Sequence, residues 1–262
     1  MTKYAVIITS CFIFYVGVCI LLYFFQEKLI FFPAKLSKDH IFTFHNFEEI
    51  NFKVEGGITI NAVLFTSRQS KGVVFFLHGN AGSIAGWGQG ASLYVENGYD
   101  VLYLDYRGYG KSAGHIESEK QLIDDAQIVY DYLQKKYSEK KIIVSGTSIG
   151  TGIAAKIASR NNPRGLILCS PYYSLKTLIK EKVPIAPAFI IKYSLDTYKF
   201  LQKVKCPITI LHGSKDEIIP VKHAVDLKKM HPKVDLTIIG GYGHNDLSGS
   251  EEYVNKWSTL LR

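Results

Sequence analysis

The chain has 262 residues, of which 47% are hydrophobic, and its formal net charge is +8 at pH 7. This length and composition suit one large domain with a sizeable core, which argues against a disordered chain. Four scattered cysteines without a C-x-x-C pair argue against zinc or a disulfide framework, and isolated lysine pairs without a recognition motif argue against nucleic acid.

The N-terminus begins with a long apolar stretch. Between Tyr4 and Phe25 it holds 22 residues without a charged side chain. As an α-helix this stretch would be about 33 Å long, enough to cross the hydrocarbon core of a bilayer. A cleavable signal peptide is the alternative, but its apolar region should be shorter, and residues 26–33 contain no small-x-small cleavage site. We therefore expect residues 1–26 to form a single transmembrane anchor and residues 27–262 to form one domain outside the bilayer.

Lysines flank this apolar stretch on both sides. Lys3 precedes it, whereas Lys28, Lys35 and Lys38 follow it. Because loops rich in Lys and Arg tend to stay in the cytoplasm, this distribution favours a cytoplasmic domain. The excess is small, so the sequence leaves the side of the membrane open and predicts only that the membrane is a partner of the chain.

Short continuous apolar runs alternate with helical segments after residue 72. The runs are typical of strands that are buried on both faces, as in a parallel sheet. Apolar residues within 122–133 and 149–158 recur at helical spacing, so each segment carries one apolar stripe. This alternation predicts an α/β fold with a mostly parallel central sheet and helices on both faces. The predicted strands are residues 73–77, 101–104, 142–144, 166–168, 208–211 and 236–239.

Two further segments complete the predicted domain. Residues 47–54 and 59–66 flank Gly56-Gly57 and indicate an antiparallel hairpin at the start of the sheet. Residues 172–205 break the alternation and predict a small inserted lid. Its aromatic side chains are expected either to line an apolar pocket beneath the lid or to pack within the lid. These aromatic residues are Tyr172, Tyr173, Phe189, Tyr193 and Tyr198.

The strongest local motif is Gly146-Thr147-Ser148-Ile149-Gly150, which directly follows one predicted strand and directly precedes a predicted helix. A serine on such a sharp turn is held in a strained conformation that exposes its hydroxyl. The residues two before and two after the serine crowd the turn and must be small, and both are glycine. Ser145 lacks this glycine spacing, so Ser148 is the predicted nucleophile.

A serine hydroxyl needs a base, and the base needs an acid that orients it. After a strand–serine–helix turn of this kind, the acid and then the histidine follow in the chain, each at the carboxyl end of a strand. Asp216 follows the run 208–211, and His244 follows the run 236–239. We therefore expect Ser148, Asp216 and His244 to form a catalytic triad.

Acyl transfer also needs donors for the developing oxyanion, and these are usually backbone N–H groups. The N–H of Ile149 is one predicted donor because it directly follows the nucleophile. The second donor should follow the strand 73–77, where the sequence His78-Gly79-Asn80-Ala81-Gly82 stands. We assign it to the N–H of Asn80, with the N–H of Ala81 as the alternative, and call residues 78–82 the oxyanion loop.

Three motifs together resemble the membrane-anchored branch of the α/β-hydrolase superfamily, which includes the eukaryotic α/β-hydrolase-domain depalmitoylases and bacterial relatives. Residues 29–33, just after the predicted anchor, are also similar to this group. The resemblance implies the α/β-hydrolase fold and the same triad over essentially the whole chain, but no particular substrate. Of the three motifs, Asp105–Ser112 is expected to be a structural loop without a catalytic role. The motifs are residues 78–82, 105–112 and 146–150.

These features predict a serine hydrolase that cleaves carboxylic esters or thioesters through an acyl-enzyme intermediate. Neither a metal nor an organic cofactor is expected. The anchor and the apolar lid favour a small-molecule or lipid-like acyl substrate. Two alternatives remain open: a serine peptidase or amidase that uses the same triad, and a membrane-held interaction module with a vestigial site.

Overall fold

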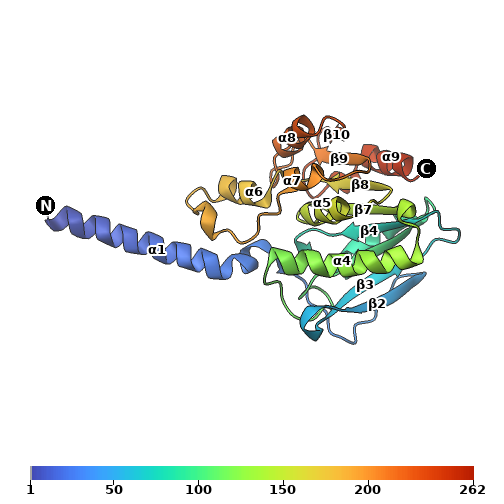
Figure 1. The fold of residues 1–262 in the computed structure, drawn as a ribbon, viewed down its shortest axis with the longest axis horizontal. Coiled ribbons are helices and arrows are strands. Elements are labelled where there is room, and N and C mark those ends of the chain that lie inside the picture. Colours follow the sequence, from blue (N-terminus) through green and yellow to red (C-terminus); the bar gives the residue numbers. More distant parts are fainter. Residues whose placement is uncertain (1) are drawn as a thin grey trace.

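An eight-stranded sheet forms the centre of the protein, whose computed structural model describes residues 2–262 (Figure 1). The strands lie in the order β10-β9-β8-β7-β4-β6-β3-β2. Strand β3 pairs antiparallel with β2 and with β6, and the remaining neighbours are parallel. The predicted hairpin and all six predicted strands are therefore present. Their bounds are β2 Phe47–Lys53, β3 Thr59–Phe65, β4 Val73–Leu77, β6 Asp100–Leu104, β7 Ile142–Thr147, β8 Gly165–Cys169, β9 Ile208–Gly213 and β10 Asp235–Ile239.

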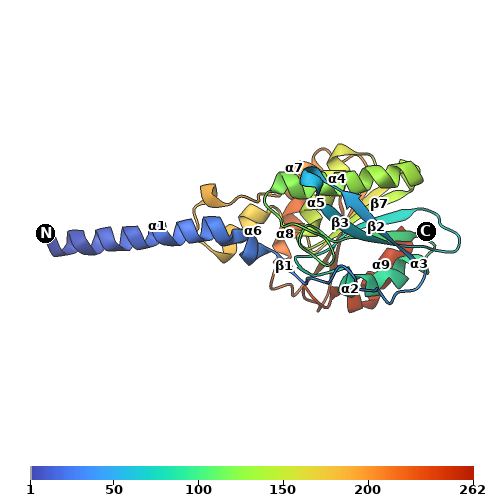
Figure 2. The ribbon, with the colours of Figure 1, turned by 90° about the horizontal axis from the view of Figure 1, so that it is seen from below.

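Helices cover both faces of the sheet, as the alternation predicts. Alternate residues of β4 point to opposite faces, so Phe75 packs with α4 and α5, whereas Phe76 packs with α3 and α9. Figure 2 shows α4, α5 and α7 on one side of the sheet and α2, α3 and α9 on the other. The bounds are α2 Ile84–Trp87, α3 Ser92–Val95, α4 Glu119–Lys136, α5 Gly150–Arg160, α7 Thr197–Leu201, α8 Lys222–Met230 and α9 Glu251–Leu260.

The sequence pattern of α4 explains why this segment is a helix and which face it buries. Ser118 precedes the helix, and its side chain accepts a hydrogen bond from the Gln121 N–H, which caps the first turn. The predicted apolar stripe, including Leu122, Val129 and Leu133, is buried against the sheet. Lys135 and Lys136 in the last turn complement the helix dipole.

The N-terminal helix α1, Thr2–Ile30, projects away from the rest of the protein (Figures 1 and 2). Its stretch Lys3–Ile30 is long and apolar enough to cross a membrane, with a mean hydropathy of 2.6 in its most apolar window. None of that window is buried against the rest of the protein. The helix continues one turn beyond residue 26, and this last turn packs on the lid. The transmembrane role of residues 1–26 stays a prediction.

The lid, residues 172–205, lies between β8 and β9. It consists of α6, Leu175–Lys182, a single 3₁₀ turn at Ala188–Ile190, and α7. Ser174 caps α6 by accepting a hydrogen bond from the Thr177 N–H. A second, two-stranded sheet was not predicted: β1, Phe32–Pro33, pairs in parallel with β5, Ala81–Gly82, and so attaches the segment after α1 to the oxyanion loop.

Candidate active site

Ser148 stands on the sharp turn between β7 and α5. Its φ angle is +53°, in the left-handed region that a residue with a side chain seldom adopts. A Cβ atom on Gly146 would collide with the carbonyl oxygen of Gly150, and one on Gly150 would collide with the carbonyl oxygen of Leu77. Close backbone packing at the turn therefore requires glycine at both positions. The neighbouring Ser145 is completely buried within β7.

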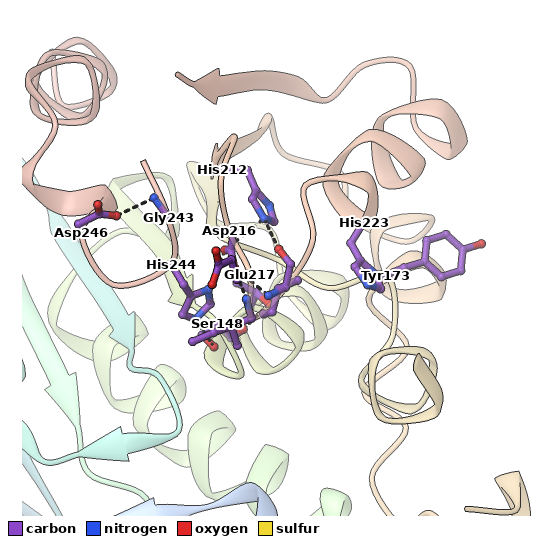
Figure 3. A network of polar contacts seen from close by, with 12 residues as sticks. Ser148, Tyr173, His212, Asp216, Glu217, His223, Gly243, His244 and Asp246 are labelled. Atoms are coloured by element: carbon purple, nitrogen blue, oxygen red, sulfur yellow. Dashed lines mark hydrogen bonds and ion pairs between the residues drawn. The ribbon is translucent and has the colours of Figure 1, made fainter. Parts of the chain in front are cut away.

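The structure brings Ser148, His244 and Asp216 together at the carboxyl ends of β7, β10 and β9 (Figure 3). His244 Nε2 lies 3.0 Å from Ser148 Oγ, and His244 Nδ1 lies 2.7 Å from Asp216 Oδ2. An ionised carboxylate only accepts hydrogen bonds, so Nδ1 carries the proton and Nε2 is free to accept the serine proton. The arrangement can deprotonate the serine hydroxyl.

The carboxylate of Asp216 is held by more than His244. Its Oδ1 atom accepts hydrogen bonds from the N–H groups of Ile218, at 3.0 Å, and Ile219, at 2.7 Å. His212 Nε2 lies 3.3 Å from Oδ2 and 2.8 Å from the carbonyl oxygen of Ile219. Burial alone would raise the pKa of Asp216, but the hydrogen bonds from His212, His244 and Ile219 outweigh it and keep the pKa well below its ordinary value. Asp216 is therefore ionised at neutral pH.

Sequence reasoning did not find His212. It belongs to β9, it is completely buried, and it contacts the same carboxylate as His244 (Figure 3). The available signal was its position four residues before Asp216, at the end of a predicted strand. That signal was weak because a histidine in a buried strand more often satisfies a local hydrogen bond than serves a site.

The oxyanion loop lies across the turn from Ser148. Within residues 2–262, neither the Asn80 N–H nor the Ile149 N–H donates to another protein group. His78 Nδ1 lies 2.7 Å from the Gly79 carbonyl oxygen. The C=O and the following N–H of a trans peptide point in opposite directions, so this contact turns the Asn80 N–H away from His78. Both predicted donors are free, and their part in oxyanion binding stays a prediction.

The motif Asp105–Ser112 contacts the oxyanion loop directly. The Tyr106 hydroxyl donates to the His78 carbonyl at 2.9 Å, and the Tyr109 hydroxyl donates to the Asn80 carbonyl at 2.7 Å. Asp105 Oδ1 accepts from the Ile84 N–H at 2.9 Å and lies 3.4 Å from His78 Nε2. The motif therefore acts as a structural loop that supports the oxyanion loop through hydrogen bonds. The sequence did not reveal this contact between the two loops.

A buried ion pair attaches this motif to helix α4. The guanidinium of Arg107 donates to both carboxylate oxygens of Asp125 on α4, at 2.6 and 2.9 Å. Both side chains are buried, and the hydrogen bonds raise the pKa of Arg107 above its ordinary value. The loop that supports the oxyanion loop is therefore fixed to the helix layer.

A cavity of about 890 Å³ opens beside Ser148 and His244. Its walls away from the catalytic residues are mainly aliphatic. They include side chains of α1, of the lid and of the segment after β9, together with aromatic side chains around α2 and α3, such as Trp87 and Tyr94. Aliphatic examples are Leu29 of α1, Ile179 and Val183 of the lid, and Ile219. The contribution of α1 was not predicted, because the sequence assigned residues 1–26 to the anchor and no role to residues 27–30.

The expectation that lid aromatic residues line this pocket is wrong for most of them. Tyr172 does line the cavity, and its hydroxyl donates to the Ile149 carbonyl at 2.9 Å. Tyr173 and Tyr198 stack on each other outside it, with ring centroids 4.4 Å apart. Tyr193 packs against Phe31, and Phe189 is 85% exposed. Packing within the lid, the alternative expectation, is found for the Tyr173–Tyr198 pair, whereas Phe189 faces the surroundings.

Comparisons with known proteins agree with this architecture. The family described as serine aminopeptidase S33 matches residues 68–195, a range that contains Ser148 but ends before Asp216 and His244. The chain is 32% identical over 198 residues to the α/β hydrolase domain-containing protein aho-3 of Caenorhabditis elegans, covering 72% of this chain and 57% of that protein. It is 30% identical over 222 residues to the α/β hydrolase domain-containing protein 17C of Xenopus tropicalis, covering 82% of this chain and 69% of that protein.

Solved structures with the same architecture include an esterase, Pf2001, of Pyrococcus furiosus, with a TM-score of 0.68 and 18% identity over 88% of this chain and 95% of that one. An α/β hydrolase from Vibrio vulnificus has a TM-score of 0.67 and 25% identity, covering 82% of this chain and 81% of that one. The likeness to the esterase, at this low identity, concerns the fold alone. Together the comparisons confirm the fold class that the sequence predicts.

Proposed function

The chain belongs to the α/β-hydrolase superfamily, and we propose that within it the protein is a serine hydrolase that cleaves carboxylic esters or thioesters. Ser148 Oγ attacks the substrate carbonyl while His244 Nε2 accepts its proton. Asp216 holds the imidazole in the required tautomer, and the N–H groups of Ile149 and Asn80 stabilise the oxyanion. His244 then protonates the leaving alcohol or thiol. Water attacks the acyl-enzyme with His244 again as base, and the carboxylic acid is released.

One observation carries this proposal: the strained Ser148 lies within 3.0 Å of an imidazole that a buried carboxylate orients at 2.7 Å. Holding a serine at positive φ costs conformational free energy, and here Gly146 and Gly150 leave the space that the strained turn needs. Such strain is most often found where a side chain has to be presented for chemistry.

The cavity supports an acyl chain as the substrate group. Its aliphatic walls and its volume of about 890 Å³ suit a flexible hydrocarbon chain next to the reactive serine. The resemblance of the sequence to membrane-anchored depalmitoylases points to the same class of substrate. We therefore propose lipid-like acyl esters or thioesters as substrates. The apolar helix α1 is the proposed single-pass anchor, and the excess of lysines after it favours the cytoplasmic side for the catalytic domain.

An amidase is the second candidate, favoured by the description of the matching family as a serine aminopeptidase. An aminopeptidase must bind the protonated α-amine of its substrate, which calls for an acidic side chain or a cluster of carbonyls. Among the described residues, no Asp or Glu lines the cavity. The ester or thioester substrate is therefore the better supported of the two.

The first test is covalent labelling by a fluorophosphonate probe. We expect the wild-type protein to be labelled, Ser148→Ala to be unlabelled, and Ser145→Ala, which changes the buried neighbouring serine, to be labelled normally. Hydrolysis of esters of increasing chain length and of an aminoacyl amide then separates the two enzyme candidates. Absence of labelling in folded wild-type protein would favour the non-catalytic interaction module instead.

A further inference from the structure

The last turn of α1 is built into the lid. Gln26 is 8% exposed, and its side-chain amide bridges the lid backbone: Nε2 donates to the Ile190 carbonyl at 3.0 Å, and Oε1 accepts from the Lys192 N–H at 2.9 Å. The Glu27 carboxylate lies 3.1 Å from Lys192 Nζ and accepts from the Tyr193 hydroxyl at 3.2 Å. These contacts fix the direction in which α1 leaves the domain.

The same helix forms one wall of the cavity beside Ser148. Leu22, Gln26, Leu29 and Ile30 all line it, so the cavity extends from the catalytic serine to the apolar part of α1. A helix that served only as a tether would have no side chains in the substrate cavity. The position of α1 therefore bears on how substrate reaches the site.

A lid segment, residues 184–191, lies alongside the apolar part of α1, as Figures 1 and 2 both show; we call it the docking loop. The Tyr15 hydroxyl donates to the Ile185 carbonyl at 2.9 Å. Tyr15 precedes Phe25, the last apolar residue of the expected span, by ten residues, which is about 15 Å along a helix axis. If α1 crosses the bilayer, Ile185 lies at the level of the hydrocarbon core.

The composition of the docking loop suits a lipid environment. Ile185 is 61% exposed and Phe189 is 85% exposed, so both present large apolar surfaces to the surroundings. The lysines on either side of the loop are bound within the protein, since Lys182 Nζ donates to the Glu217 carbonyl at 2.8 Å and Lys192 Nζ pairs with Glu27, so the surface that the loop presents is apolar.

Many backbone polar groups of the docking loop are satisfied within the protein. Lys180 Nζ donates to the carbonyls of Pro184, at 2.9 Å, and Ala186, at 2.7 Å. Tyr15 and Gln26 donate to two more carbonyls of the loop, those of Ile185 and Ile190, and its two prolines have no N–H. This arrangement is what non-helical backbone needs at hydrocarbon depth, because lipid chains offer no hydrogen bonds.

We propose that the docking loop inserts into the leaflet nearest the catalytic domain, and that the acyl chain of a substrate held in that leaflet enters the cavity between α1 and the lid without passing through water. The partner of this surface is the lipid leaflet itself. The entry route rests on the proposed acyl-ester function, whereas insertion of the loop does not. The two parts are therefore tested separately.

Insertion is tested on the full-length chain in liposomes of phosphatidylcholine with a fraction of phosphatidylserine. Cys11 and Cys19 are changed to serine, Cys169 and Cys206 are buried and stay, and a nitroxide is attached to Phe189→Cys. We expect this nitroxide to collide more often with oxygen than with a water-soluble nickel complex. A nitroxide at Ile128→Cys on α4 is the control and should show the reverse. Equal behaviour of the two sites would overturn insertion.

The entry route is tested with the double variant Ile185→Asp/Phe189→Asp, whose side chains face outward and do not line the cavity. We expect kcat/KM for a long-chain ester dissolved in the bilayer to fall at least about tenfold, while hydrolysis of a soluble acetyl ester changes little. Ile128→Asp should affect neither. Equal loss on both substrates, or no loss on either, would overturn the entry route. If the wild type hydrolyses no ester, the proposed function fails, and the nitroxide measurement still decides insertion.

Discussion

The two sides of the cavity are built in different ways. On the catalytic side, Ser148, His244 and Asp216 are joined by contacts of 3.0 and 2.7 Å, and backbone packing at Gly146 and Gly150 leaves no room for a side chain. On the other side, α1 and the lid contribute mainly flexible aliphatic side chains. Proton transfer requires fixed distances, whereas binding of a hydrocarbon chain requires only volume and apolar surface. Substitutions should therefore be far more damaging on the first side than on the second.

The largest effect is expected from Gly150→Ala. The added methyl group would collide with the carbonyl oxygen of Leu77 in β4, so the turn and the sheet must shift apart. We expect a loss of about 3 kcal/mol or more in the free energy of unfolding, together with loss of fluorophosphonate labelling. Denaturant unfolding measures the first and gel fluorescence the second. Gly249→Ala is the control, because a Cβ there meets open space; similar effects of both variants would contradict the packing argument.

Asp216→Asn should leave the fold intact but lower kcat by about 10⁴, because an amide no longer holds His244 in the required tautomer. The control is Asp246→Asn, since the Asp246 carboxylate lies in the same region and accepts a hydrogen bond from the Gly243 N–H at 2.7 Å instead of contacting His244 (Figure 3). Steady-state hydrolysis of a soluble ester measures both variants. A loss below tenfold for Asp216→Asn would show that the orientation of His244 does not depend on this carboxylate.

Asp216 should also make stability depend on pH. The folded state keeps its pKa below the ordinary value of 3.8, so the ionised carboxylate stabilises the fold above that pH. This contribution is lost as the pH falls through the folded-state pKa. The Tm of the wild type relative to Asp216→Asn should therefore be higher at pH 7 than at pH 3. A difference between the two proteins that stays constant over this range would contradict the assignment.

Tyr109→Phe should have an intermediate effect. It removes the hydroxyl that donates to the Asn80 carbonyl at 2.7 Å, so the oxyanion loop loses one of its supports. We expect kcat to fall about tenfold with little change in KM, and the free energy of unfolding to fall by about 1 kcal/mol. Tyr130→Phe removes a comparable hydroxyl contact, to Glu139 in the turn directly after α4, and should cost similar stability without affecting kcat. Equal kcat values for the two variants would argue against a supporting role.

The smallest effect is expected from Ile179→Trp on the aliphatic side. The larger side chain should narrow the cavity, and neighbouring aliphatic groups can partly repack around it. We expect the ratio of kcat/KM for a long-chain ester to that for an acetyl ester to fall about fivefold. A panel of esters of increasing length measures this ratio, with Ile128→Trp on α4 as the control. A thousandfold drop in this ratio would show that substitutions on the lid side are as damaging as those on the catalytic side.

The order of the elements and the three catalytic candidates could be predicted from the sequence. Strands and helices have different hydrophobic patterns, so residues 73–77 can be recognised locally as a strand and residues 122–133 as a helix. The carboxyl ends of parallel strands meet at one edge of a sheet, so residues that follow β7, β9 and β10 must lie near one another. Ser148, Asp216 and His244 could therefore be placed together without any knowledge of side-chain packing.

The remaining features depended on contacts between segments far apart in the chain. The pairing of His212 with Asp216, the support of Asn80 by Tyr109 and the seating of Gln26 on the lid are decided by packing geometry, which no local period encodes. The direction of the lid aromatics is a further example, because Phe189 could face the cavity or the surroundings with the same sequence pattern. The sequence by itself determined the architecture and the catalytic candidates, whereas only the tertiary structure decided the walls of the substrate cavity.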